Sequence, residues 1–310
     1  MAEGKWITGL SPDMDLAEAA RHALGQRLGL VGQCLPPAIA DALDDDEHVH
    51  QLRVATRRAD ACLRIFRDCL PRRRYDSMRE RLRAIRRAAG AARDADVFLA
   101  ALRSRAAEAK TGDLAGLDFL VAYSLGQREV AQEDLESLEI GHERPFDAAA
   151  RRSLEAVRPS RVGERRLEDL ARPRVAELVE RLEAATRANL DDYECLHQVR
   201  IAGKRLRYAL EILMVCFGCE VRERVYPCIE EMQEILGRAN DSHVAIGRLQ
   251  RLKIRLKEWP GMKGRAKAGI EGLLRFHQRR LPQERKRFLA WLKAWREMGV
   301  GEMMGAAVAG

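Results

Sequence analysis

The chain has 310 residues, of which 46% are hydrophobic, 33% charged and only 5% aromatic. This composition supplies enough apolar side chains for a packed core, and its abundant Ala, Leu, Arg and Glu favour helices over sheets. No run approaches the ~20 apolar residues of a membrane span, and the first residues lack the apolar stretch of a signal peptide. We therefore expect a soluble, cytoplasmic protein that does not insert into a membrane.

The formal net charge of +8 is unevenly distributed. Residues 48–110 contain seventeen Lys and Arg against seven Asp and Glu, and residues 263–296 contain eleven against two. Positive charge gathered into two segments predicts an anionic partner.

Apolar residues recur at steps of three and four along eight segments, which is typical of helices. The predicted helices span residues 13–35, 48–70, 75–110, 115–140, 168–192, 195–217, 221–257 and 263–296. Pro36 and Pro37 are expected to end the first helix, and Pro282 to kink or split the last one. Residues 141–167 contain two prolines and two glycines and show weak apolar periodicity, which favours a connecting segment.

We therefore predict an all-α fold with two halves. The expected organisation is an N-terminal extension (1–12), a first four-helix bundle (13–140), a connection (141–167), a second four-helix bundle (168–296) and a flexible C-terminal tail (297–310).

The two halves contain near copies of one motif. HQLRVATRRADACLRIF begins at His50 and HQVRIAGKRLRYALEIL begins at His197, an offset of 147 residues. The same offset, without a gap, relates GAARDADV at Gly90 to GRANDSHV at Gly237. Two matching segments at a single offset indicate an internal duplication.

Each copy separates basic and apolar side chains onto opposite sides of one helix, because successive residues are rotated by about 100°. The basic stripe of the first copy contains His50, Arg53, Arg57 and Arg64, and that of the second contains His197, Arg200 and Lys204, with Arg207 beside it. Leu52, Ala59, Leu63, Phe66 and Leu70 lie on the opposite side of the first helix, and Val199, Leu206, Leu210, Leu213 and Phe217 on that of the second.

The next predicted helix adds a second basic stripe, in which Arg79, Arg86 and Arg93 are spaced by seven, and we add Arg86 and Arg93 to the candidate ligand-binding residues. Arginine donates forked hydrogen bonds to phosphate oxygens, and lysine supplies a point charge. The stripe from His50 to Arg64 is about 21 Å long at 1.5 Å per residue, which suits an extended chain of phosphates better than a single phosphate.

HQLRVATRR with RDADV, followed by HQVRIAGKRLRYALE with NDSHV, resembles the CHAD family, which is named for conserved histidines in an α-helical domain. The resemblance extends over about residues 13–296. It implies two four-helix bundles related by pseudo-twofold symmetry around a basic central groove or pore that binds inorganic polyphosphate without catalysis. Some members are fused to a triphosphate-tunnel domain, and because the sequence lacks the ExExK signature of that domain, the chain is similar to a stand-alone member.

The resemblance also implies which residues bind the ligand. The matching positions are His50, Arg53, Arg57, Arg58 and Arg64 in the first half and His197, Arg200, Lys204, Arg205 and Arg207 in the second. Asp60 departs from the family, which often has a basic residue there, and Glu211 stands at the place equivalent to Arg64. We therefore expect the more basic first half to dominate binding, with association with polyphosphate granules as one role.

Other readings of these residues remain open. The histidines could cap or pack against the bundle, and the arginines could form an ordinary solvated face. Asp94 and Asp241 invite a catalytic role, but we favour carboxylates that pair with stripe arginines. Cys216 and Cys219 resemble a metal pair only weakly, since no second pair follows at zinc-site spacing, and we expect no cofactor or metal.

Two alternative functions compete with polyphosphate binding. A helical nucleic-acid-binding protein is disfavoured because the stripes lack interleaved aromatic residues for stacking. An enzyme, either a metal-dependent phosphohydrolase or a histidine phosphotransfer protein, is disfavoured because the basic faces lack clustered carboxylates and because arginines surround each motif histidine.

Overall fold

A computed structural model of the chain describes residues 4–40, 45–107, 111–140, 145–159, 165–258, 260–299 and 303–305. Within these ranges the chain is helical and contains no β-strand, so the predicted all-α class is confirmed. The α-helices are α1 (Leu16–Ala40), α2 (Asp46–Ile65), α3 (Arg72–Ala107), α4 (Thr111–Ile140), α5 (Phe146–Glu155), α6 (Leu167–Thr186), α7 (Tyr193–Leu213), α8 (Tyr226–Arg255) and α9 (Pro260–Glu297). No helix in the described residues is long and apolar enough to cross a membrane.

The eight predicted helices correspond to α1–α4 and α6–α9, but two of the predicted proline breaks are wrong. Pro36 and Pro37 lie inside α1, which continues to Ala40. Pro282 lies inside α9, which continues to Glu297, so Pro282 does not split the helix. In both places buried neighbours, such as Leu35 and Phe288, hold the helix against the core and offset the loss of the proline N–H donor.

Helix α5 lies within the predicted connection, residues 141–167, and corrects that prediction over Phe146–Glu155. Its buried residues Phe146, Ala150 and Ser153 recur at steps of four and three and pack toward α1 and α3. The prolines and glycines that flank this short stretch mask its helical period in the sequence.

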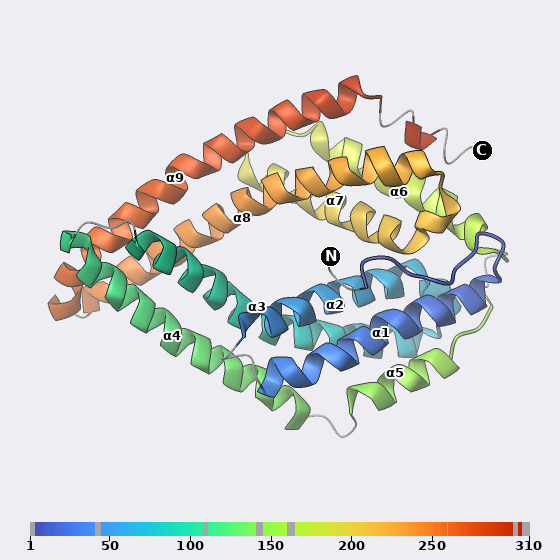
Figure 1. Cartoon of the computed structure of the whole chain (residues 1–310), viewed down its shortest axis with the longest axis horizontal. Helices are drawn as coiled ribbons and strands as arrows, with labels where there is room; N and C mark the ends of the chain where they lie inside the picture. Colours follow the sequence, from blue (N-terminus) through green and yellow to red (C-terminus); the bar gives the residue numbers. More distant parts are fainter. Residues whose placement is uncertain are drawn as a thin grey trace.

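The helices pack in the same order in the two halves of the chain (Figure 1). Each helix from α1 to α4 packs against the next along the chain, and so does each helix from α6 to α9. The halves meet where α2 contacts α7 and where α4 contacts α9. Each of these contacts joins helices that hold the same place in their half.

Local structure in the first half is repeated 147 residues later in the second half. α2 begins at Asp46 and α7 at Tyr193, and the 3₁₀ turns that follow them span Arg67–Cys69 and Met214–Cys216. Asp45 caps α2 by accepting a hydrogen bond from the backbone N–H of Glu47 at 2.9 Å, and Asp192 caps α7 by accepting one from Glu194 at 3.0 Å. The repeated sequence therefore folds into the same capped helix twice.

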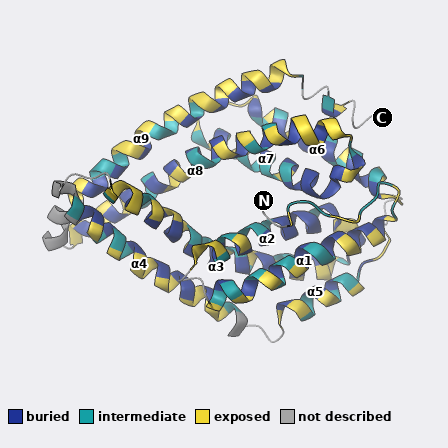
Figure 2. Ribbon diagram, viewed as in Figure 1, coloured by how far each residue is buried: buried dark blue, intermediate teal, exposed yellow. Residues whose placement is uncertain are grey.

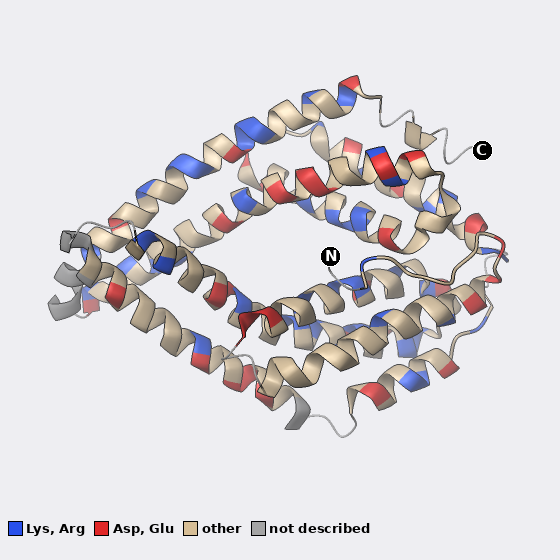
Figure 3. Cartoon of the chain, in the orientation of Figure 1, with Lys and Arg blue, Asp and Glu red and all other residues tan. Residues whose placement is uncertain are grey.

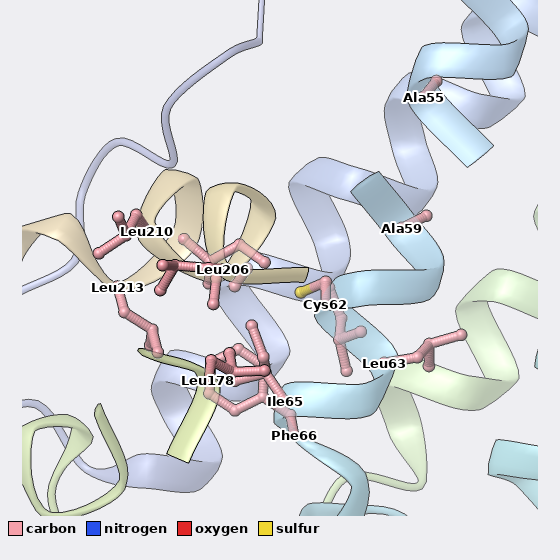
Figure 4. Close-up of a cluster of buried hydrophobic side chains, with 14 of the residues drawn as sticks. Ala55, Ala59, Cys62, Leu63, Ile65, Phe66, Leu178, Leu206, Leu210 and Leu213 are labelled. Atoms are coloured by element: carbon pink, nitrogen blue, oxygen red, sulfur yellow. The ribbon is translucent and has the colours of Figure 1, made fainter. Parts of the chain in front are cut away.

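The main hydrophobic core is continuous across the two halves rather than divided between them. In Figure 4, Phe66, which directly follows α2, lies near Leu178 of α6, and Leu206 of α7 lies in the same cluster. Phe66 and Leu206 are among the side chains predicted for the apolar sides of the motif helices, and the alternation of buried and exposed residues is visible in Figure 2. A smaller apolar cluster joins α3 and α4 to α8 and α9 at the other end of the molecule.

The described part of the predicted N-terminal extension links the halves. Arg27 of α1 donates hydrogen bonds to the carbonyl oxygens of Gly4 and Lys5. Lys5 forms an ion pair of 2.9 Å with Glu230 of α8, and Trp6 packs against Tyr226 with 4.7 Å between ring centroids. The segment therefore spans from α1 to α8.

At the other end of the chain, Met304, which falls in the predicted flexible tail, is buried against the main core. Residues 300–302 and 306–310 of that predicted tail lie outside the described residues.

Candidate anion-binding site

Basic side chains from α2 and α7 gather where these two helices meet. Figure 3 shows Lys and Arg on both helices in the middle of the molecule. We call Arg53, Arg57, Arg200, Lys204 and Arg207 the central cluster, because each of the other four lowers the pKa of Lys204 through its charge. The fold thus brings together basic residues that lie about 147 positions apart in the sequence.

The Lys204 ammonium is the group most perturbed by this arrangement. Burial, and then the charges of the surrounding arginines, lower its pKa to about 6. Helix packing around it is close, since a Cβ at the neighbouring Gly203 would overlap the side chains of Met232 and Gln233 of α8. Lys204 therefore loses most of its charge at neutral pH unless an anion is bound.

Arg57 and Arg200 are half-buried guanidinium groups. In the part of the chain that the structure describes, no carboxylate lies within ion-pair distance of Arg57, Arg200 or Lys204. The Nε atoms of Arg57 and Arg200 are buried and have no hydrogen-bond acceptor among the described residues. Buried donors normally have a partner, so these two atoms are available to an acceptor that the described residues do not supply.

The lowered pKa values of Arg57 and Arg200 agree with their lack of a paired carboxylate among the described residues. Burial lowers the pKa of Arg57, Tyr208 partly offsets that effect, and Arg53, Arg207 and Arg200 lower it further. Burial also lowers the pKa of Arg200, although the charge of Asp241 opposes the shift. Both guanidinium groups would gain stability from a negatively charged partner.

Within the central cluster, Arg207 forms an ion pair with a buried carboxylate. Its Nε lies 3.6 Å from Glu211, and its guanidinium lies over the ring of Tyr208 at 5.0 Å. Burial opposes its charge, but Tyr208 and Glu211 outweigh burial and raise its pKa.

Arg53 is also partly neutralised. Its Nη1 donates to Asp94 at 2.8 Å and to the carbonyl of Gly90 at 3.1 Å, so the predicted pairing of Asp94 with a stripe arginine is confirmed. The equivalent Asp241 raises the pKa of Arg200, but the two side chains form no ion pair within the described residues. The halves therefore differ in how far each carboxylate neutralises its arginine.

The motif histidines lie near the N-terminal ends of α2 and α7. His50 is half-buried, and burial, followed by the charges of Arg93, Arg57 and Arg53, lowers its pKa despite the nearby Glu47. Nδ1 of His197 is buried without a hydrogen-bond partner among the described residues. His50 therefore lies beside basic side chains, and His197, with a ring nitrogen unpartnered within the described residues, lies next to the ring of Tyr193 at 6.1 Å between ring centroids.

The structure places Arg58 elsewhere than the other predicted ligand-binding residues. Its Nε donates to Glu211 of α7 at 2.7 Å, and the side chain is only 6% exposed. Arg58 lies about 100° around α2 from Arg57, which directs it into the interface with α7. The equivalent Arg205 is exposed on the surface.

Arg64 and Arg86 share the carboxylate of Asp60, which is 2% exposed. Ion pairs of 2.6 Å to Arg64, 2.9 Å to Arg79 and 3.3 Å to Arg86 surround it. Burial would raise the pKa of Asp60, but the three arginines outweigh burial and lower it. Asp60 therefore holds a separate basic group, to which Arg79 belongs although it was not among the predicted site residues.

Arg93, the second residue predicted from the period of seven, forms an ion pair of 2.5 Å with Asp46 of α2. The positive charge of Arg93 lowers the pKa of His50, and this is its effect on the site. The predicted stripe on α3 is therefore divided between the partners Asp60 and Asp46.

Among the described residues, no group of three His, Cys, Asp or Glu side chains is arranged to hold a metal ion. Cys216 is buried, whereas Cys219 is exposed. Tyr193 stacks on His243 at 3.6 Å between ring centroids and donates a hydrogen bond to Asn240 at 3.2 Å. His243 thus packs against an aromatic ring.

These observations define a class of protein. It is all-helical in the described residues, and it carries a half-buried group of basic side chains between two sets of helices. The family model of the CHAD domain matches residues 22–250, and the chain belongs to this family. The resemblance seen in the paired motifs is thereby confirmed.

Two solved structures resemble the chain. The crystal structure of the CHAD domain from the plant Ricinus communis is 25% identical, with a TM-score of 0.74, and the match covers 94% of this chain and 96% of that one. PptA from Streptomyces chartreusis is 19% identical, with a TM-score of 0.66, over 91% of this chain and 100% of that one, and shows a likeness of fold. No match was found among curated proteins.

Proposed function

We propose that the chain binds inorganic polyphosphate at the central cluster and does not act on it as an enzyme. The observation that carries this proposal is that Arg57, Arg200 and Lys204 are half-buried without a carboxylate in ion-pair distance among the described residues. Unpaired buried guanidinium cations cost several kcal/mol each, and Lys204 avoids that cost only by losing its proton. A bound polyanion would offset that cost and would supply acceptors for the unpartnered guanidinium atoms.

A chain of phosphates suits the site better than a single phosphate. Arg53 and Arg57 are one helical turn apart on α2, as are Arg200 and Lys204 on α7. Each turn advances about 5.4 Å along the helix axis, so the basic groups are spread out rather than focused on one point. Binding to a repeating anion would also give a physical basis for association with polyphosphate granules.

We further propose that the two halves are an internal duplication with pseudo-twofold symmetry and that the central cluster lines a basic groove or pore between them. The shared 147-residue offset of helices, caps and 3₁₀ turns supports this proposal. Contacts between α2 and α7 and between α4 and α9 are those expected when a twofold axis relates the halves, because equivalent elements then meet each other.

Both halves supply cations to the proposed site. Arg53 and Arg57 come from the first half, and Arg200, Lys204 and Arg207 from the second. The extra charge expected to favour the first half, on Arg64, is partly neutralised by Asp60. We therefore propose nearly equal contributions instead of dominance by the first half.

Titration with polyphosphate of defined length, compared with pyrophosphate at the same ionic strength, tests this function. We expect the longer chain to bind at least tenfold more tightly, because it reaches the basic groups of both helices. Equal affinity for pyrophosphate would contradict the proposal. Competition with single-stranded RNA ranks the nucleic-acid alternative, which we disfavour because Tyr208, the aromatic ring against Arg207, is only 5% exposed and cannot stack on a base.

A labelled phosphate group on His50 or His197 after incubation with a phosphodonor would support a phosphotransfer reaction instead. We expect none, because Arg93, Arg57 and Arg53 lie near His50, and this arrangement favours holding an anion over exposing a histidine to a phosphodonor protein.

A further inference from the structure

The second strongly positive segment of the chain takes no part in the central cluster. It forms most of α9, which carries a succession of basic side chains in Figure 3. One face of α9 and the last turn of α3 line a pocket of about 510 Å³. Its basic lining residues are Arg105, Arg275, Arg279, Arg280 and Arg287. We call this hollow the α9 pocket.

The pocket residues on α9 follow one another along a single face. Arg275, Arg279, Gln283 and Arg287 are spaced by four, so each lies about 6 Å further along the helix axis than the one before. Arg105 reaches the pocket from α3 and makes it a concave site with two walls. An ordinary solvated helix face would have no second wall.

A buried carboxylate holds two of these arginines in place. Glu284 is 2% exposed and forms ion pairs of 2.8 Å with Arg287, 3.7 Å with Arg280 and 3.0 Å with Arg238 of α8. One carboxylate shared among three arginines leaves an excess of positive charge. The guanidinium of Arg280 also lies 5.8 Å from the ring of Phe276, which fixes it further.

Arg275 and Arg279 add charge that no carboxylate neutralises. Both are exposed, and neither has an ion-pair partner in the described ranges of the chain. A concave surface lined by charges of one sign concentrates counter-ions, because the low-dielectric walls focus the field. The walls and the charges therefore favour a small, highly charged anion.

We infer that the α9 pocket is a second phosphate-binding site, separate from the central cluster. Its volume falls within the roughly 300–1,000 Å³ range of small-ligand sites, so it accommodates a short run of phosphate groups. Arg275 and Arg279 bind the phosphate oxygens, while Arg280 and Arg287, held by Glu284, form the pre-organised floor. The choice of phosphate as the anion rests on the proposed function, but the existence of the site does not.

Calorimetric titration with tripolyphosphate tests the inference by stoichiometry. The pocket variant is Arg275→Ala with Arg279→Ala, and the central variant is Arg57→Ala with Arg200→Ala. Lys286→Ala with Arg296→Ala is the matched control, because it removes two exposed positive charges from α9 outside the pocket. We expect two bound tripolyphosphates per chain for the wild type and for the control, and one for each of the other variants.

The possible outcomes separate this inference from the proposed function. A single wild-type site that only the central variant removes would overturn the second site and leave the proposed function intact. A single site that only the pocket variant removes would support the inference and contradict the proposed function. Equal stoichiometry and affinity for the pocket variant and the control would overturn the inference, and no binding by the wild type would overturn both.

Discussion

Arg58 in α2 and Glu211 in α7 form a buried ion pair, 2.7 Å from Nε to Oε2, that joins the two halves of the chain. The hydroxyl of Tyr226 donates to the other carboxylate oxygen of Glu211 at 2.9 Å. Arg205, which corresponds to Arg58 at the 147-residue offset, is exposed. Two arginines in matching sequence positions thus have opposite environments.

Arg58→Ala should lower the free energy of unfolding by about 3–5 kcal/mol, because it leaves the buried carboxylate of Glu211 without its closest cation. Arg205→Ala should change it by no more than about 0.5 kcal/mol, as is usual for an exposed side chain. Urea unfolding of both variants measures the difference. Similar losses in the two variants would show that the buried pair contributes nothing beyond a surface charge.

A second prediction concerns the buried carboxylate of Asp60. At the 147-residue offset this negative charge corresponds to the positive charge of Arg207. Asp60→Asn should reduce stability by about 3–5 kcal/mol, since Arg64, Arg79 and Arg86 lose their shared buried carboxylate. The same change should tighten polyphosphate binding, because it releases positive charge. Urea unfolding of the variant measures the expected loss of stability. Polyphosphate titration of the folded variant measures the expected gain in affinity. Unchanged binding would show that the Asp60 group does not act on the ligand, and weaker binding would contradict the predicted sign.

Lys204 makes both stability and binding depend on pH. Its pKa is lowered to about 6 in the folded chain, whereas an unfolded lysine titrates near 10.4. Between these values the unfolded chain holds the extra proton, so the free energy of unfolding should rise as the pH rises from about 6 to about 10. In Lys204→Met this contribution to the pH slope should disappear. An unchanged slope in Lys204→Met would show that Lys204 keeps its ordinary pKa.

Polyphosphate binding should restore the proton to Lys204, because the anion stabilises the ammonium form. Titrations at pH 8 in two buffers with different ionisation enthalpies should therefore show uptake of up to one proton per chain. Lys204→Arg should abolish the uptake while keeping the positive charge. Equal uptake by this variant would assign the proton to another group, with His50 the next to test.

Salt dependence distinguishes a polyanion site from specific contacts to a single phosphate. Affinity for polyphosphate should fall linearly on a double-logarithmic plot against salt concentration, as bound counterions are released. Arg57→Ala with Arg200→Ala should reduce the slope by about 1.4, roughly 0.7 for each lost contact, by analogy with single-stranded nucleic acids. A slope unaffected by the double substitution would contradict direct contact between these arginines and the ligand.

The parts of the structure that depend on local periodicity are predictable from the sequence. Helical geometry alone places Arg53 with Arg57 on one side of α2 and Leu63 with Phe66 on the other, and the burial of Leu63 and Phe66 agrees. The same geometry places Arg200 and Lys204 together on α7. Repetition at one offset then predicts that the two helices are built alike.

The parts that depend on contacts between distant segments are not predictable in this way. Arg58 pairs with Glu211, 153 residues away, and only the packing of α2 on α7 decides that its guanidinium is buried. Pro36 and Pro37 continue α1 because Leu35 and Ala38 are anchored in the core. α5 did leave a signal in the apolar spacing of Phe146 and Ala150, which the surrounding prolines and glycines obscured.

The central claim is that Arg57 and Arg200 bind the anion, and the dissociation constant of Arg57→Ala with Arg200→Ala for polyphosphate of defined length tests it most directly. The matched control is Arg87→Ala with Arg151→Ala, which removes two exposed charges from α3 and α5. Hydrogen bonds to charged groups contribute about 1.5–3 kcal/mol each, so losing two should weaken binding by at least about 100-fold, while the control stays within about threefold of the wild type. Equal dissociation constants for the two double variants would contradict the account.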